Sequence, residues 1–426
     1  MKLLALSTDQ APHISIPLRF FAVAPLFLIL AALILAISPD NPFSDLHAPV
    51  LLAATHAITL GFITMVMFGA LQQMMPVVIG SALPAANFLA WFSQLALIAG
   101  TLLLAAGFIL NKPLLLQVAG ISLGAAFALF IAAVLISLAR SAAKNASKTA
   151  IALAIFALAA AVTLGILLLY GYSVGLPLNY AQLSATHISL ALGGWVMLLI
   201  VGVSYQVVPM FQLTPPYAKW LALSLAPAIL TALILPLPAL LLDELPRWLT
   251  FFTHNLFWLC ATLFSLSTLI LQHQRRRSIP DTTLLFFRIG MISLLCVSLL
   301  AIAAPWIIDS EQLKILGGLI FVLGFVVSLI HGMLYKIVPF LIWFHLFRGG
   351  SFHEIPNMKE IIPEIWIRRH FWLHLYTLAA ALLAPYLLIA AQLLVLCLLL
   401  QGLVLGLALY SAIVMYQHTL HRLTHS

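Results

Sequence analysis

Histidine is the residue of this chain best suited to chemistry, and three of its 14 copies recur in one dipeptide. His56, His187 and His254 each follow a threonine within an apolar run. A neutral imidazole in a low-dielectric layer is a good ligand for iron or copper, and it is costly to bury without a partner. The pattern favours haem or metal ligation. The alternative is that each imidazole bonds a neighbouring carbonyl or hydroxyl and shapes a helix contact.

A ten-residue segment occurs three times in related form. In each copy a glycine is followed seven residues later by a proline, and a polar pair stands four and three residues before that proline. The copies are 67–76, 200–209 and 330–339, with the pairs Gln72/Gln73, Tyr205/Gln206 and Tyr335/Lys336. Their spacings of 133 and 130 residues leave room for about four membrane spans per repeat. Coincidence is the alternative, since glycine and proline are common in membrane helices.

The repeat sets the depth at which each histidine is expected. His56 precedes the proline of its copy by 20 residues and His187 by 22, a difference of about 3 Å along a helix. His331 precedes its proline by only eight residues, and so lies about 18 Å deeper. We therefore expect His56 and His187 to ligate a common centre, with His254 and His187 as candidate metal ligands. His331 is a further candidate haem ligand, expected to serve a second centre or to bond Tyr335 or the region of Tyr205.

The polar pairs of the second and third copies have two interpretations. Tyr205, Gln206, Tyr335 and Lys336 could relay protons, because a buried lysine with tyrosine and glutamine neighbours can exchange them. Lys336 could instead extend its ammonium group to the membrane interface, which lies close to the end of its helix.

Two further groups of histidines have helical spacing. His370 and His374 lie four residues apart at the start of an apolar segment, and His418, His421 and His425 lie on one face of a C-terminal helix. Both spacings permit metal binding. We expect both groups to form polar faces at the inner membrane surface.

The composition defines the class of protein. Hydrophobic residues make up 64% of 426 residues, charged residues only 7%, and the mean hydropathy is +1.16. This balance predicts one all-α, polytopic membrane domain over residues 1–426, with the lipid bilayer as its surroundings. The net charge of +8 is therefore attributed to membrane topology and not to nucleic-acid binding.

Twelve apolar segments are long enough to cross a bilayer. Their expected limits are 20–37, 50–79, 88–110, 114–139, 150–172, 183–209, 218–241, 249–272, 284–308, 314–343, 371–390 and 392–416. Each copy of the repeated segment falls near the end of span 2, 6 or 10. The prediction is a pseudo-threefold 4+4+4 bundle with repeat units of about 20–140, 150–272 and 284–416.

Lysine and arginine predict the orientation. With the amino terminus in the cytoplasm, all but three of the 19 basic residues fall at or near the inner side; the exceptions are Lys112, Arg247 and Lys314. This bias predicts a bacterial inner-membrane protein with both termini in the cytoplasm.

These features together resemble subunit I of the haem-copper oxidase and nitric oxide reductase superfamily. The stretch 186–209, led by His187 and ending in a glycine, tyrosine and proline motif, is similar to a histidine-led span of that superfamily. His56 matches its low-spin haem ligand on span 2. The resemblance implies b-type haem with copper or iron possible, a cytochrome or quinol electron donor, a diatomic gas such as O2 or NO, and an oxidoreductase if the protein is an enzyme.

The chain departs from that superfamily at two places. Span 7 has no adjacent histidine pair for copper or non-haem iron, and span 10 carries only His331. The resemblance thus implies a simplified subunit without a complete binuclear centre, acting in electron transfer or gas handling. The segment 55–61 also looks like the histidine-led helices of the NnrS family of nitrosative-stress proteins. A histidine-dependent transporter and an assembly factor are the remaining alternatives.

Overall fold

The computed structural model describes residues 12–240, 245–306, 310–347 and 355–425, and in these ranges the regular structure is entirely helical. Within a bilayer core no water is available to bond backbone groups, so long apolar runs satisfy their N–H and C=O groups inside helices. The predicted all-α class is confirmed.

Ten helices within the described residues are long and apolar enough to cross a membrane. They span Ser15–Ala36, Pro49–Ile79, Ala86–Ile109, Pro113–Arg140, Ala146–Val174, Tyr180–Gln212, Arg247–His273, Thr282–Ala303, Glu311–Phe347 and Leu388–Thr424. The other two predicted spans are also helical. Helix α9 (Lys219–Ile234) is a shorter apolar helix of 16 residues, and α15 (Glu364–Leu383), of 20 residues, is not among the ten. The expected span ends at 241 and 308 lie outside the described residues.

The chain divides into two compact units, and the boundary falls within two helices. Unit 1 takes its described residues from 72–278 and 294–309, and unit 2 from 12–71, 279–293 and 310–426. The helix α3 (Met65–Ile79) passes from unit 2 to unit 1 at Gln72, and α11 (Thr282–Ala303) does so at Leu294.

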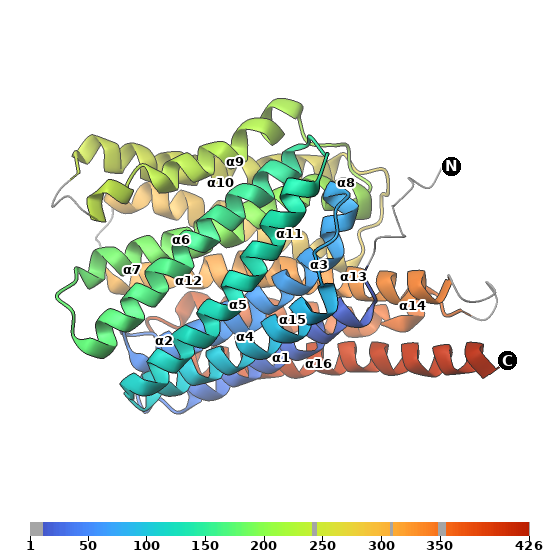
Figure 1. The fold of residues 1–426 in the computed structure, drawn as a ribbon, viewed down its shortest axis with the longest axis horizontal. Helices are drawn as coiled ribbons and strands as arrows, with labels where there is room; N and C mark the ends of the chain where they lie inside the picture. The colour runs from blue at the N-terminus through green and yellow to red at the C-terminus, as the bar shows by residue number, and fades with distance from the viewer. Residues whose placement is uncertain (1–11, 241–244, 307–309, 348–354, 426) are drawn as a thin grey trace. The chain divides into compact units, whose positions relative to one another are not determined.

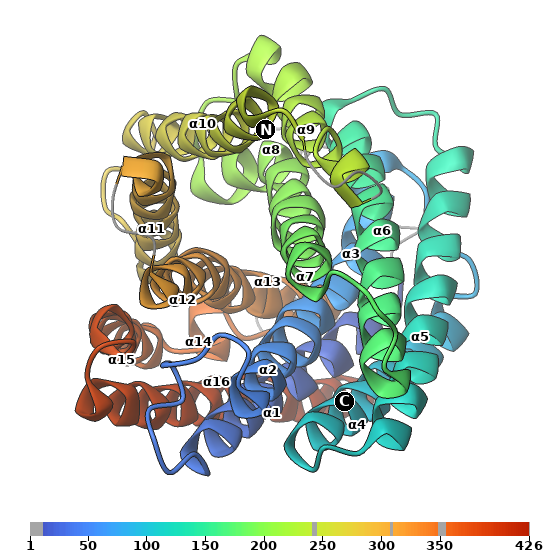
Figure 2. The same ribbon diagram turned by 90° about the vertical axis from the view of Figure 1, so that its left-hand side faces the viewer.

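Unit 1 is built from helices that neighbour one another along the chain. It contains α4 (Ala86–Ile109), α5 (Pro113–Arg140), α6 (Ala146–Val174), α7 (Tyr180–Ile188), η3 (Ser189–Met197), α8 (Leu198–Gln212), α9 (Lys219–Ile234), η4 (Leu237–Leu240), α10 (Arg247–His273) and η5 (Ala304–Trp306). Helix α4 packs along α5, α5 along α6, and α9 along α10 (Figure 2).

Unit 2 joins segments from both ends of the sequence. It contains α1 (Ser15–Ala36), α2 (Pro49–His56), η2 (Ala57–Thr64), α12 (Glu311–Leu319), η6 (Ile320–Val327), α13 (Ser328–Phe347), α14 (Met358–Ile361), α15 (Glu364–Leu383) and α16 (Leu388–His425). The long helix α16 lies beside α1 and also packs on α15 (Figure 1).

Each copy of the repeated segment is preceded by a π-helical stretch. These stretches are η2, η3 and η6, and each begins 19 or 20 residues before the proline of its copy. A π-helix places an extra residue in each turn, and such stretches are frequent at functional sites. The three long helices that contain the repeat therefore share a backbone distortion as well as a sequence motif.

The same three helices also share a packing mode. Each has a glycine 15 residues and another seven residues before its proline, and an added Cβ at any of the six would lie less than 3.0 Å from a side chain of the preceding long helix. The contacts are Gly61 and Gly69 with α1, Gly194 and Gly202 with α6, and Gly324 and Gly332 with α11. Small residues at such positions let membrane helices approach closely.

We expect Gly402→Ala to destabilise the contact between α16 and α1. A Cβ at Gly402 would lie 2.9 Å from the Pro25 carbonyl oxygen and 3.1 Å from the Ile29 nitrogen, and backbone cannot move aside as a side chain can. The expected loss is about 1–3 kcal/mol of unfolding free energy, measured by thermal unfolding in detergent. Gly406→Ala is the matched control, because its Cβ would meet only Pro25 at 3.6 Å. Equal effects of the two substitutions would contradict the close approach.

Candidate functional site: a buried histidine cluster

Three histidines of unit 2 lie in one fully buried cluster. His331 comes from α13, and His370 and His374 come from successive turns of α15. All three side chains have 0% of their surface exposed. Because histidine is costly to bury in a membrane without partners, this cluster is the strongest candidate for a functional site in the described part of the chain.

The imidazole rings are in contact with one another. The ring centroid of His331 lies 4.6 Å from that of His370 and 5.4 Å from that of His374. The fully buried ring of Phe286, on α11, lies within 6 Å of all three, at 5.9, 5.8 and 5.5 Å respectively. An aromatic side chain therefore covers the cluster, and none of the three histidine side chains is exposed to water.

Two of the histidines are held by polar side chains. The Tyr335 hydroxyl lies 2.7 Å from Nδ1 of His370. His374 is held at both nitrogens: Nδ1 lies 2.8 Å from Oε1 of Gln401 and Nε2 lies 2.6 Å from Oγ of Ser328. These bonds fix the planes of both rings.

The remaining ring nitrogens lack hydrogen-bond partners. Neither nitrogen of His331, nor Nε2 of His370, has a partner among the described residues. A buried polar atom left without a partner costs about 1–3 kcal/mol. Three such atoms in one cluster indicate that the cluster is a ligand-binding site.

The expectation that His370 and His374 form a polar face at the membrane surface is wrong. Both rings point into the protein, because α15 packs against α16 and Gln401 of α16 supplies a buried partner. The preceding arginines, Arg368 and Arg369, made this helix start look interfacial, and both of them are exposed. Gln401, within the apolar run of α16, was the available signal.

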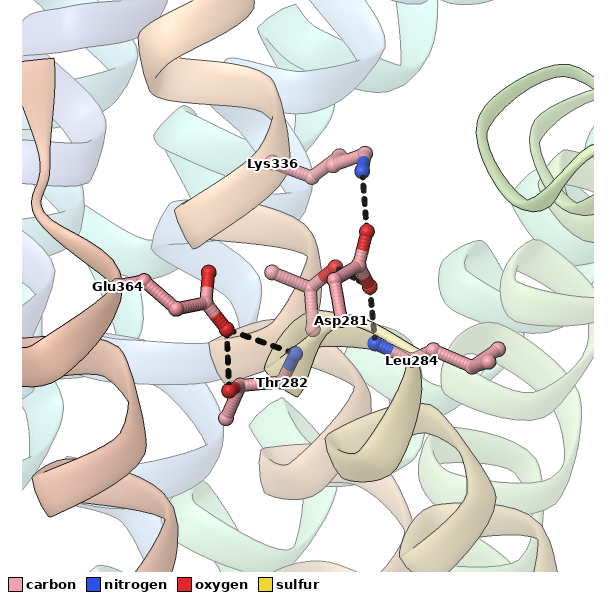
Figure 3. A network of polar contacts seen from close by, with 6 residues as sticks. Asp281, Thr282, Leu284, Lys336 and Glu364 are labelled. Carbon is pink, nitrogen blue, oxygen red and sulfur yellow. Dashed lines mark hydrogen bonds and ion pairs between the residues drawn. The ribbon is translucent and has the colours of Figure 1, made fainter. Parts of the chain in front are cut away.

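Lys336 bonds a carboxylate near the start of α11. Its Nζ lies 2.9 Å from Oδ2 of Asp281, and the Asp281 carboxylate also accepts the backbone N–H of Leu284 (Figure 3). Beside it, Glu364 at the start of α15 accepts the backbone N–H of Thr282 at 3.0 Å and also its hydroxyl. Lys336 therefore forms an ion pair inside unit 2, and the two carboxylates tie the starts of α11 and α15 to α13 and to each other.

We expect Asp281→Asn to lower stability at neutral pH but not in acid. Burial by itself would raise the pKa of Asp281, but the hydrogen bond and positive charge of Lys336 outweigh burial and hold the pKa below its ordinary value of 3.8. A depressed pKa gives stability that is present above the ordinary pKa and is lost as pH falls through the folded value.

The expected loss at pH 7 is about 0.5–1 kcal/mol, because both side chains are partly exposed to solvent. The measurement is thermal unfolding of wild type and Asp281→Asn from pH 7 to pH 3. The exposed residue Asp40 provides the control substitution Asp40→Asn. A difference that stays constant down to pH 3 would contradict the ion-pair explanation.

His56 and His187 each have a carbonyl oxygen at Nδ1 within their own unit, His56 from its own helix and His187 from α6. Each stands at the end of the α-helix that leads into a π-helical stretch. Nδ1 of His56 lies 2.8 Å from the Leu52 carbonyl oxygen, and Nδ1 of His187 lies 2.8 Å from the Ala161 carbonyl oxygen. Gly165 leaves room for the His187 ring, since a Cβ there would lie 2.9 Å from its Cε1. In both rings the proton is thereby placed on Nδ1 and the lone pair on Nε2.

His254 has a different environment from His187, although both belong to unit 1. Nε2 of His254 lies 2.9 Å from the Ala301 carbonyl oxygen on α11, and its ring meets Trp258 edge-on. The residue is exposed. The two imidazoles thus bond carbonyls of different helices, and the expected pairing of His187 with His254 at one metal stays a prediction.

The four residues of the expected proton path have different surroundings, and only Tyr335 and Lys336 bond a side chain within the described residues. The Tyr205 hydroxyl is buried without a hydrogen-bond partner among the described residues, and its ring packs edge-on against Tyr217. Gln206 is exposed. In unit 2, Tyr335 bonds the histidine cluster, while Lys336 bonds its carboxylate.

The other histidine groups lie at the protein surface. His418 and His421 are exposed on α16, as a polar face requires. Asp45, His47 and Glu311 are also exposed, and they are the one group of three candidate metal ligands, among the described residues, whose atoms lie within 4.8 Å of one another. Glu311 already accepts the backbone N–H of Leu46, so this group ties the segment before α2 to the start of α12.

Comparison with models of known protein families gives no match, and comparison with curated proteins gives none either.

Proposed function

We propose that this chain is an integral membrane haem protein that binds b-type haem, with His56 in unit 2 and His187 in unit 1 each a candidate ligand within its own unit, and that it acts in electron transfer or in the handling of O2 or NO. The architecture proposed for it is twelve spans in three units of four. This architecture is supported by an arrangement that occurs three times. Each time a long helix contains a π-helical stretch, two glycines and a proline, and its two glycines pack closely against the preceding long helix.

The observation that carries the haem assignment is the matched state of the two histidines. A ligating imidazole normally donates its other ring N–H to a carbonyl or carboxylate, which fixes the tautomer and the ring orientation. His56 and His187 both have a carbonyl oxygen at Nδ1, so the lone pair lies on Nε2, the nitrogen through which each would bind a metal. In the third copy Leu319, not a histidine, precedes the π-helical stretch. Only the first two copies therefore provide a haem ligand at this position.

The proposed haem would supply one-electron chemistry or an iron site for a diatomic gas. The chain's own contribution is to hold two neutral imidazoles in apolar surroundings, at fixed orientation, on helices distorted at the ligand position. The proposed setting is a bacterial inner membrane with both termini in the cytoplasm and a cytochrome or quinol as electron donor. This orientation is supported by the distribution of lysine and arginine.

The test is the absorption spectrum of the full-length protein purified from haem-replete cells. We expect a Soret band that is lost or strongly shifted in His56→Ala and His187→Ala. His418→Ala is the matched control, because that histidine is exposed on α16 and should leave the band unchanged. A colourless wild-type protein, or a Soret band that survives both substitutions, would overturn the proposal.

A further inference from the structure

The buried histidine cluster has the chemistry of a second site, independent of haem ligation by His56 and His187. Among the described residues, no carboxylate, ammonium or guanidinium group bonds any of its three rings; the partners are Tyr335, Gln401 and Ser328. A ligand of this cluster must therefore be one that neutral imidazoles bind in a low-dielectric interior.

The hydrogen bonds of α15 and α16 fix the tautomer of His374. The Thr377 hydroxyl donates to the Leu373 carbonyl, so it accepts from Nε2 of Gln401. The amide oxygen of Gln401 then faces Nδ1 of His374 and accepts its proton. The lone pair of His374 consequently lies on Nε2.

His370 also has one bonded ring nitrogen and one without a partner among the described residues. Its tautomer is not fixed in the same way, because the Tyr335 hydroxyl can either donate to Nδ1 or accept from it. The Tyr335 oxygen lies at Nδ1, while Nε2 has no partner. An oxygen at one ring nitrogen and an open second nitrogen is the arrangement in which proteins hold metal-binding histidines. His331 adds two further open nitrogens.

Ser328 gives His374 a way to release its second nitrogen. The Ser328 hydroxyl lies 2.6 Å from Nε2 of His374 and also 2.5 Å from the Gly324 carbonyl oxygen. When the hydroxyl donates to that carbonyl, Nε2 of His374 becomes free to bind another group and no buried donor is left without an acceptor. Gly324 belongs to the π-helical stretch η6, which thus provides the alternative acceptor.

We propose that His331, His370 and His374 bind one Cu(I) ion. Imidazole nitrogen suits copper, zinc, iron and nickel, whereas the lack of oxygen anions argues against calcium, magnesium and manganese. The charge then selects among the metals. Because the cost of burying an ion grows with the square of its charge, a divalent ion among neutral ligands costs roughly four times as much as a monovalent one.

Binding requires the rings to move closer together. The three ligand nitrogens are not yet within 4.8 Å of one another, but His331 has no hydrogen bond that restrains its ring and lies 4.6 and 5.4 Å from the other two ring centroids. Helices α13 and α15 are not the elements on which the haem-copper oxidase resemblance would place copper, which is span 7.

The test uses Cu(I) alone, added anaerobically to the full-length, chelator-treated protein in detergent, in competition with a chromophoric Cu(I) chelator. We expect one copper per chain, with a first shell of nitrogen only in X-ray absorption. Removal of a ligand, in His331→Ala or His370→Ala, should abolish competitive binding. Removal of the bond that orients a ligand, in Gln401→Leu, should weaken binding by about 10- to 100-fold. His345→Ala, on the same helix α13 but bonded to Tyr416, is the control.

Failure to bind copper, or binding that both ligand substitutions leave unchanged, would overturn the proposal. Loss of copper binding in His47→Ala would also overturn it, because copper would then be bound by the exposed group of Asp45, His47 and Glu311. If the alanine variants do not fold, His331→Leu keeps the volume and serves instead, with size-exclusion chromatography as the check. The Soret band separates the two proposals: His331→Ala should keep it and lose copper, while His187→Ala should lose it and keep copper.

Discussion

Replacement of Phe286 with alanine is expected to lower the free energy of unfolding by about 3–5 kcal/mol, the range for deleting a large aromatic side chain from a packed core. The Phe286 ring is fully buried and touches five other rings. Their residues are His331, Tyr335, His370, Phe371 and His374, with centroid distances from 5.1 to 6.3 Å. The cavity left behind would be lined by imidazoles whose orientation the ring now maintains.

The measurement is chemical or thermal unfolding in detergent, with Ile292→Ala as the control. Ile292 lies on the same helix α11, within unit 2, and 45% of its surface is exposed. Its truncation should change stability far less than that of Phe286. Comparable losses for the two substitutions would show that the histidine cluster is not a packed core.

The helical framework could be predicted from the sequence because hydrophobicity and length are nearly sufficient for a membrane helix. The expected span 114–139 is the helix Pro113–Arg140, and the expected span 150–172 is Ala146–Val174. The repeated glycine and proline also pointed to the three helices that share a π-helical stretch. The stretches themselves could not be predicted, since one extra residue in a turn leaves an apolar run unchanged.

The histidine cluster could be predicted only in part, and the reason is physical. Depth along a helix follows from counting residues, which is why the sequence separates His331 from His56; their difference in depth stays a prediction. Which helix face is buried depends on the neighbouring helix, and in an apolar chain both faces look alike. His370 and His374 follow two arginines, and only their contact with Gln401 across α15 and α16 shows that they point inward.

His331→Leu and Gln401→Leu are expected to change the stability of the metal-free protein in opposite directions. His331 has two buried nitrogens without hydrogen-bond partners among the described residues, and leucine of similar size removes both. We expect a gain of about 1–3 kcal/mol, the cost of leaving such groups unpaired. Gln401 bonds both His374 and Thr377. Its replacement leaves the buried Nδ1–H of His374 without an acceptor and should lower the free energy of unfolding by a similar amount.

The two variants are compared with wild type by thermal unfolding after chelation, and again after addition of Cu(I). A residue kept for packing alone would not be improved by leucine, so a stabilised His331→Leu variant would mean that the histidine is retained for binding at the expense of stability. Copper should then raise the melting temperature of wild type and leave that of His331→Leu unchanged, because a ligand stabilises only a fold that binds it. A destabilised His331→Leu variant would instead mean that the ring already has partners, and the argument for an open ligand site at the cluster would lose its basis.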